Sequence, residues 1–150
     1  MKNSALIVVV YSNDFVADNG KLTWGKPGQR IESYIVRRID DYNSHKCPIF
    51  FMMDLHHEDD YNHPENKLFP PHNILGTSGR QLYGKVNDIY QNIQYNDHVH
   101  FIDKTRYDSF CGTPLELLLR ERGVKRLEIV GVCTDICVLH TAISAYNLGY

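Results

Sequence analysis

Four short apolar segments, rich in β-branched and aromatic residues, constrain the fold of this chain more than any other feature. Runs of this length and composition are typical of buried strands. The first and the last are the most continuously apolar, and we expect both of their faces to be buried. The segments are residues 5–11 (ALIVVVY), 48–54 (PIFFMMD), 98–104 (HVHFIDK) and 126–133 (RLEIVGVC).

Stretches with helical periodicity separate these predicted strands. Residues 29–42 carry isoleucines at helical spacing, and Pro114 opens a leucine-rich helix that stops at Gly123. A regular alternation of strand and helix is typical of parallel sheets joined by right-handed crossovers. The sequence therefore predicts an α/β fold with three layers (α/β/α), in which helices cover both faces of a mainly parallel sheet.

The chain of 150 residues is predicted to form one domain, residues 1–150. Its last predicted helix, residues 138–150, is closed by Gly149 at the point where an alternating fold would continue into another strand. We therefore expect the domain to be incomplete at its C-terminal end, without a final strand and helix. A partner, including a second copy of the chain, could cover the apolar surface at that edge.

Charge and composition narrow the classes of partner. The formal net charge is −2, without the clustered Lys and Arg that nucleic acids and anionic membranes attract. We expect a small-molecule ligand, no nucleic acid and no membrane. Residues 5–11 are too short to span a membrane and are not followed by a signal-peptide cleavage site, which favours a cytoplasmic protein. In that reducing compartment the four cysteines are expected to be free thiols.

Reactive side chains follow the predicted strands. Ligands of open α/β sheets bind beyond the carboxyl ends of the strands, so these side chains are expected to meet at one rim. Cys137 follows a strand through a turn into a helix, where the helix dipole and free amides would lower its pKa and could stabilise an oxyanion. A cysteine that only packs, and a Lys104 that is only solvated, are the alternatives. The residues at the rim are Asp14, Asp54, His56, Lys104 and Cys137.

The long segment of residues 56–77, for which we predict no regular structure, carries the ligand types of a divalent metal site. Asp54 and His56 share one face of a strand end because their spacing is two residues. Glu65 and His72 would add a second carboxylate and a second imidazole, a set suited to a transition metal. An exposed polar loop could have the same composition.

Four motifs together resemble bacterial nicotinamidases of the isochorismatase-like cysteine hydrolase family. GVCTDICVLHTAISAYNLGY is similar to the nucleophile segment, and DLH, KLFPPHNILGTSGRQLY and DKTRYDSFCGT are similar to the metal and lysine segments. The similarity runs from about Ala5 to the last residue, and the motifs are specific only in combination. It implies hydrolysis of nicotinamide to nicotinic acid and ammonia through a cysteine thioester, in NAD salvage.

The resemblance also implies a role for each catalytic residue. Cys137 would be the nucleophile and Lys104 its charge partner. The backbone amides of Cys133 and Cys137 would form the oxyanion hole, after a cis peptide bond between Val132 and Cys133.

The same resemblance implies a metal and a ring pocket. The metal would be zinc, or else manganese or iron, and would bind the pyridine nitrogen of the substrate. Aromatic residues are often plain core, but three match pocket positions of the family: Phe15, Phe69 and Tyr107. The metal ligands would be Asp54, His56, Glu65 and His72, with Glu65 matching a subset of nicotinamidases.

One position departs from the family pattern. The first strand of the family ends in Asp-x-x-x-Asp-Phe, whose first Asp is the catalytic base, but Val10 stands at that position here and Asp14 matches the second, loop-shaping Asp. A general base contributes typically about 100- to 10,000-fold, so impaired turnover is expected. Lys104 would also lose its anionic neighbour. The alternatives are a non-catalytic protein that binds metal and nicotinamide, or a related amidohydrolase or isochorismatase-type hydrolase with another substrate.

Overall fold

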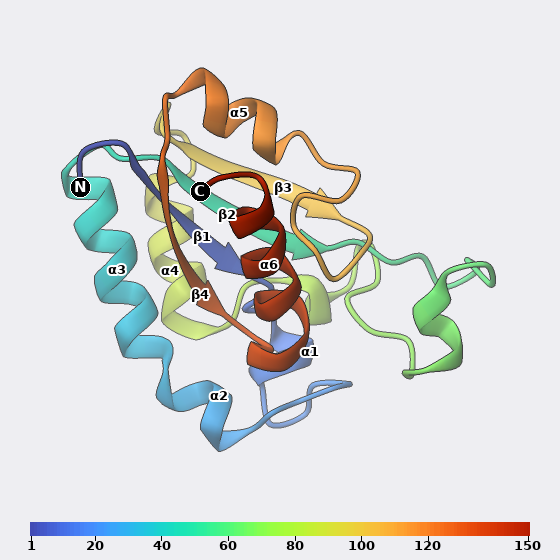
Figure 1. The fold of residues 1–150 in the computed structure, drawn as a ribbon. Helices are drawn as coiled ribbons and strands as arrows, with labels where there is room; N and C mark the ends of the chain where they lie inside the picture. The colour runs from blue at the N-terminus through green and yellow to red at the C-terminus, as the bar shows by residue number, and fades with distance from the viewer.

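A four-stranded sheet forms the centre of the protein in a computed structural model that describes residues 1–150 (Figure 1). Each neighbouring pair of strands is parallel, which confirms the predicted sheet. The strands are β1 (Ser4–Val9), β2 (Ile49–Asp54), β3 (Val99–Lys104) and β4 (Arg126–Gly131), in the order β3-β2-β1-β4.

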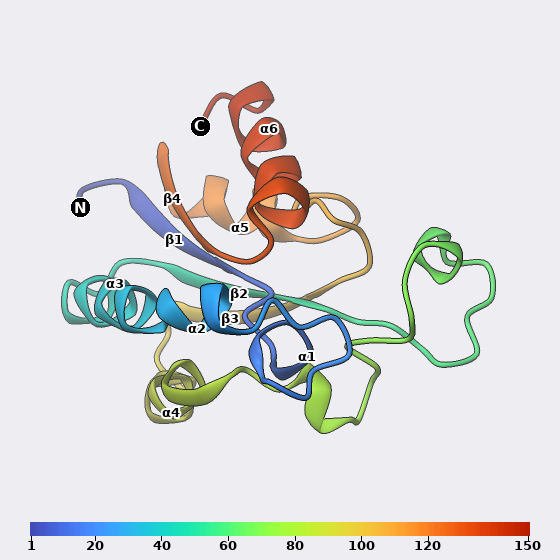
Figure 2. The same cartoon turned by 90° about the horizontal axis from the view of Figure 1, so that it is seen from below.

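Helices cover both faces of the sheet, as predicted (Figure 2). The helices α2 (Lys26–Arg30), α3 (Glu32–Ser44) and α4 (Gly84–Ile93) lie on one face, and α5 (Leu115–Glu121) and α6 (Leu139–Asn147) lie on the other. A short helix, α1 (Asn13–Val16), follows β1. None of the helices is long and apolar enough to cross a membrane.

The helix predicted over residues 29–42 is two helices in the structure. Ile31 is both the C-cap residue of α2 and the N-cap residue of α3. Pro27 lies in the first turn of α2, where its missing N–H costs nothing, so a separate short helix starts there.

Burial of the strands follows their place in the sheet. Every residue of β1, between β2 and β4, is buried. The expectation that both faces of the last strand are buried is wrong, because β4 is an edge strand in which only Val130 is buried. The core is instead concentrated on β1 and β2 and on the α3 residues Ile35 and Ile39.

The strand order reverses beside β1, and this reversal positions the site. The chain runs outward from β1 to β2 and β3 and then returns to place β4 on the other side of β1. Val9 pairs with Gly131, and a Cβ atom at Gly131 would lie 2.0 Å from the carbonyl oxygen of Val9, so only glycine fits. Ligand crevices of open α/β sheets lie at such a reversal, beyond the carboxyl ends of the strands.

The predicted irregular segment, residues 56–77, projects from this carboxyl edge (Figure 1). Its only helix is a short 3₁₀ helix, Pro64–Lys67. An isolated parallel bridge between His56, just after β2, and Ile74 joins the two ends of the segment. Its two ends are therefore held beside the end of β2, where candidate ligands lie.

Candidate active site and metal centre

A pocket of about 420 Å³ at the carboxyl edge of the sheet gathers most of the predicted site residues. Its volume lies within the range of small-molecule sites. His56 and Lys104 do not line it but are buried beside it, at 8% and 1% exposure. The predicted residues that line the pocket are Phe15, Asp54, Glu65, Phe69, His72, Tyr107, Cys133 and Cys137.

Cys137 lies in one turn of π-helix, Thr134–Val138, that precedes α6. The carbonyl oxygen of Cys133 accepts hydrogen bonds from the amides of Ile136 (3.2 Å) and Val138 (3.1 Å), which close this turn. The peptide bond between Val132 and Cys133 is cis, as the resemblance implied. All four cysteines are free thiols, also as predicted.

Burial is the largest influence on the ionisation of Cys137. Burial raises the pKa of its thiol to about 12, although the charge of Lys104 acts in the opposite direction. The expectation of a lowered pKa is therefore wrong for the resting protein. The thiol is only 3% exposed, and the cost of desolvating a thiolate exceeds the attraction of one nearby cation.

Lys104 and Asp54 form a buried ion pair. The Nζ atom of Lys104 lies 2.5 Å from Oδ1 of Asp54 and also donates to the carbonyl oxygen of Arg106 at 2.8 Å. Burial acts to lower the pKa of Lys104, but Asp54 and Cys137 outweigh it, and the pKa lies above its usual value. Lys104 therefore has an anionic neighbour despite Val10, which corrects the expectation from the sequence.

Val10 is fully buried and has a left-handed backbone, with φ at 41°. A β-branched residue rarely adopts this conformation, which costs of order 1–3 kcal/mol. The backbone is held by the amide of Val10, which donates to Met52, and by the amide of Ser12, which donates to Val10. The residue therefore offers neither a carboxylate nor a relaxed conformation at this position.

Asp14 shapes a loop in the structure, as the resemblance implied. Its Oδ2 accepts from the amide of Asn73 at 2.7 Å, and its Oδ1 accepts from the amide of Lys21 at 3.2 Å. Gly79 packs so closely on this carboxylate that a Cβ atom there would lie 2.3 Å from it. The carboxylate is thus fully engaged in joining three chain segments.

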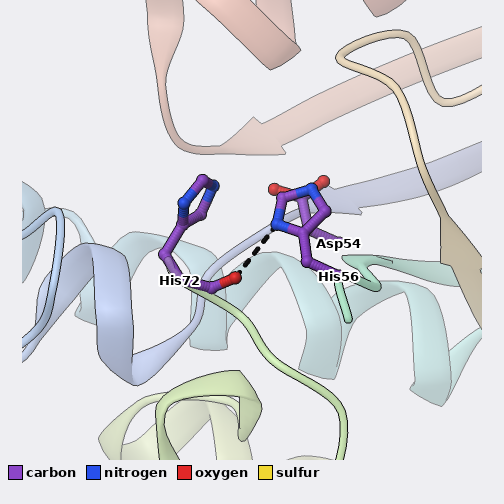
Figure 3. A group of neighbouring side chains, drawn as sticks. All are labelled: Asp54, His56 and His72. Atoms are coloured by element: carbon purple, nitrogen blue, oxygen red, sulfur yellow. Dashed lines mark hydrogen bonds between the residues drawn. The ribbon is translucent and has the colours of Figure 1, made fainter. Parts of the chain in front are cut away.

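His56 and His72 each have an Nε2 atom without a hydrogen-bond partner, and both of these atoms lie near the carboxylate of Glu65. The Nδ1 of His56 donates to the carbonyl oxygen of His72 at 3.0 Å (Figure 3), and the Nδ1 of His72 donates to that of Pro70 at 2.8 Å. Each neutral ring therefore carries its proton on Nδ1. The buried Nε2 atoms have no hydrogen-bond partner. Oxygens of Glu65 lie 3.8 Å from Nε2 of His56 and 3.3 Å from Nε2 of His72.

These residues fit a divalent metal. Ligand atoms of Asp54, His56 and His72 all lie within 4.8 Å of one another. Orphaned buried nitrogens need a partner, and metal-bound histidines characteristically donate their other nitrogen to a carbonyl, as both do here. Burial also lowers the pKa of His56, which favours the neutral ring that binds a metal, whereas at His72 the contact with Glu65 outweighs burial and raises the pKa. With Glu65 the set has two imidazoles and two carboxylates.

His63 is close to this cluster but has no nitrogen available. Its Nε2 donates to the carbonyl oxygen of Thr105 at 2.7 Å, and its Nδ1 accepts from the amide of Glu65 at 3.2 Å. Ligand atoms of His63, His56 and Glu65 lie within 4.8 Å of one another, yet both ring nitrogens of His63 are used. His63 therefore shapes the loop that presents Glu65.

Trp24 is the largest of the pocket residues that the sequence did not reveal. It lines the pocket together with residues 20–23 and Ile136. It is the only tryptophan of the chain and lies between Gly20 and Gly25 in a polar stretch, a signal that could have drawn attention to it. Its position depends on how that stretch folds over the strand ends.

The fold and the pocket define a three-layer α/β domain of hydrolase type. The chain belongs to the isochorismatase family, whose domain matches residues 4–150. It is 51% identical to the isochorismatase family protein PncA of Bacillus subtilis, over 97% of this chain and 80% of that protein. The solved pyrazinamidase/nicotinamidase of Streptococcus mutans is 54% identical, with a TM-score of 0.96 over 98% of this chain and 81% of that one.

A more distant relative has been solved with a bound metal. The pyrazinamidase of Pyrococcus horikoshii, solved in complex with zinc, is 28% identical to this chain, with a TM-score of 0.84. The alignment covers 99% of this chain and 80% of that one. A metal-bound relative with the same fold agrees with the fit of the His56 and His72 cluster to a divalent ion.

Proposed function

We propose that this protein is a nicotinamidase, which hydrolyses nicotinamide to nicotinic acid and ammonia in NAD salvage in the cytoplasm. The observation that carries the proposal is the pocket, which places the thiol of Cys137 beside the candidate metal ligands Glu65 and His72 and the aromatic side chains of Phe15 and Phe69. The similar protein from S. mutans is a pyrazinamidase/nicotinamidase by name, which supports the same reaction.

In the proposed reaction, the Sγ atom of Cys137 attacks the carboxamide carbon of nicotinamide. The bond to the amide nitrogen breaks, and the thiol proton leaves with that nitrogen as ammonia. Water then hydrolyses the thioester, which releases nicotinic acid and returns a proton to the thiol. The amides of Cys133 and Cys137 would stabilise the oxyanion, and the ammonium of Lys104 would stabilise the thiolate.

The candidate metal and ring residues would orient the substrate. A divalent ion, zinc or else manganese or iron, would supply a Lewis-acid site for the pyridine nitrogen. It would be held by Asp54, His56, Glu65 and His72. The aromatic side chains would hold the planar ring, and these are Phe15, Phe69 and Tyr107.

Val10 limits the proposed reaction. Because burial raises the pKa of Cys137 to about 12, the thiol is protonated at pH 7, and the reaction needs a group that accepts the thiol proton. The family carries that group at the position of Val10, and loss of a general base costs typically about 100- to 10,000-fold. We therefore propose that turnover is impaired.

The same observation favours a second candidate function. A protein with Val10 in place of the base, but with an intact ring pocket and metal ligands, would bind nicotinamide without hydrolysing it. A related amidohydrolase or isochorismatase-type hydrolase with another substrate is less favoured, because the histidine-containing metal loop would then have no ring nitrogen to bind.

Ammonia release from nicotinamide tests the proposal. We expect slow release by the unaltered protein, stimulated by zinc, and none by Cys137→Ala. Cys111→Ala is the matched control, because Cys111 is an exposed thiol that does not line the pocket. Release that persists in Cys137→Ala would show that the nucleophile is wrong. Zinc-dependent binding of nicotinamide in calorimetry, without any ammonia release, would favour the binding protein.

A further inference from the structure

Trp24 lines the pocket and remains half exposed. The pocket is largely apolar in this region, where Phe15, Leu22 and Ile136 share its wall with Trp24. Phe15 is 6% exposed, whereas Trp24 is 48% exposed. An exposed indole face beside an apolar pocket gains contact area when a planar ring enters.

The backbone around Trp24 is held firmly in place. The amide of Trp24 donates to the carbonyl oxygen of Phe15 at 2.8 Å, and the amide of Leu22 donates to that of Asp14 at 3.0 Å. The amide of Gly25 donates to Oγ1 of Thr23 at 2.9 Å. Gly28 lies near the base of the side chain, because a Cβ atom there would be in van der Waals contact with Cβ of Trp24 at 3.4 Å. The side chain is therefore anchored at its base.

Trp24 also lines the pocket together with Cys133, which lies in the turn that precedes Cys137. Cys133 is the residue whose amide is proposed to face the oxyanion. The wall of one pocket therefore carries both an indole and the reacting end of the site.

We propose that Trp24 is a substrate-positioning residue, whose indole covers the planar ring of an aromatic carboxamide and holds it against the turn at Cys133. This inference rests on the proposed function, since it needs an aromatic amide in the pocket. Trp24 does not take part in proton transfer or bond cleavage. Its removal therefore weakens binding and leaves the chemical step little changed.

Fluorescence of the intact protein tests the contact directly, because Trp24 is the only tryptophan. With zinc present, nicotinamide should produce a saturable change in emission and protect Trp24 from quenching by acrylamide. Calorimetry on the same samples measures binding independently. Binding in calorimetry with unchanged emission and unchanged quenching would overturn the role of Trp24 while leaving the proposed function standing. Absence of calorimetric binding would overturn the proposed function, and this inference with it.

Variants provide the second test. Trp24→Ala should weaken nicotinamide binding about 3- to 10-fold, the value of one aromatic pair, whereas Trp24→Phe should stay within about 2-fold. Tyr95→Ala is the matched control, because Tyr95 is 90% exposed and does not line this pocket. In a Val10→Asp background, Trp24→Ala should raise KM and change kcat by less than about 2-fold. Equal affinities of Trp24→Ala and the unaltered protein would overturn the inference, and the fluorescence measurement on the unaltered protein keeps the test decisive if the alanine variant does not fold.

Discussion

The Nζ atom of Lys104 lies 2.5 Å from Oδ1 of Asp54, and this ion pair joins the two halves of the candidate site. The ammonium is close enough to Cys137 that each influences the ionisation of the other. The carboxylate of Asp54 also belongs to the cluster with His56 and His72. A single carboxylate therefore connects the candidate nucleophile to the candidate metal ligands.

Asp54→Asn should destabilise the protein strongly. The side chains of Lys104 and Asp54 are 0% and 4% exposed, and removal of one partner of a buried pair leaves an uncompensated charge, at a cost of about 3–5 kcal/mol. The double variant Asp54→Asn with Lys104→Met should recover much of this loss. Urea unfolding at pH 7 measures both. A single variant that loses less than about 1 kcal/mol would contradict the strength of the pair.

Zinc binding should depend on His56 and His72 and be independent of His57. Each of the first two offers a buried Nε2 atom without another partner, whereas His57 is exposed. Alanine at either ligand should weaken zinc affinity by more than the roughly 10- to 100-fold typical of losing an outer hydrogen-bond partner. Titration with a competing chelator measures the affinity. Equal zinc affinities of His72→Ala and His57→Ala would count against the proposed ligand set.

The sequence anticipated the parts of the site that depend on strand ends. The two-residue spacing of Asp54 and His56 predicts that they share one face of a strand end. The position of Cys137 after a strand predicts that it lies at the same rim of the sheet. The pairing of Asp54 with Lys104 could not be anticipated, because it depends on the register of β2 against β3. That register places the two residues directly opposite one another.

Other features depend on contacts between segments that are distant in the sequence, and the hydrophobic pattern of one segment does not reveal such contacts. The exposure of β4 follows from its place at the edge of the sheet, and the raised pKa of Cys137 follows from burial by neighbouring loops. The pocket position of Trp24 depends on the path of residues 20–25 over the strand ends. A local periodicity does not encode any of these.

Alkylation should reveal the raised pKa of Cys137. Because thiolate is the reactive form and the pKa lies near 12, its rate with iodoacetamide should rise roughly tenfold for each pH unit between pH 7 and pH 9. Mass spectrometry of peptides can separate this rate from that of Cys111, which is exposed and should react first. A rate at Cys137 that reaches a plateau below pH 8 would show that the thiol is already activated.

Stability at low pH should depend on Glu128, which ties β4 to α3. Nε and Nη2 of Arg38 lie 2.6 Å and 2.7 Å from its two carboxylate oxygens, and this pair holds the pKa of Glu128 below its usual 4.5. The stabilisation is therefore fully present above pH 4.5 and is lost as pH falls through the lowered pKa.

Glu128→Gln should consequently lower the free energy of unfolding by about 1.5–3 kcal/mol at pH 7, the range for hydrogen bonds to charged groups. The difference from the unaltered protein should shrink as the pH is lowered below 4.5. Urea unfolding at several pH values measures it. A difference that is constant with pH would mean that the carboxylate charge does not contribute.

The most direct test of the account compares ammonia release from nicotinamide by three proteins, the unaltered chain, Val10→Asp and Val10→Asn. Asp and Asn tolerate the left-handed backbone at this position equally, so they relieve the same strain, but only Asp supplies a proton acceptor. We predict that Val10→Asp is about 100- to 10,000-fold faster than the other two. Equal rates for Val10→Asp and the unaltered protein would contradict the claim that this position lacks the catalytic base.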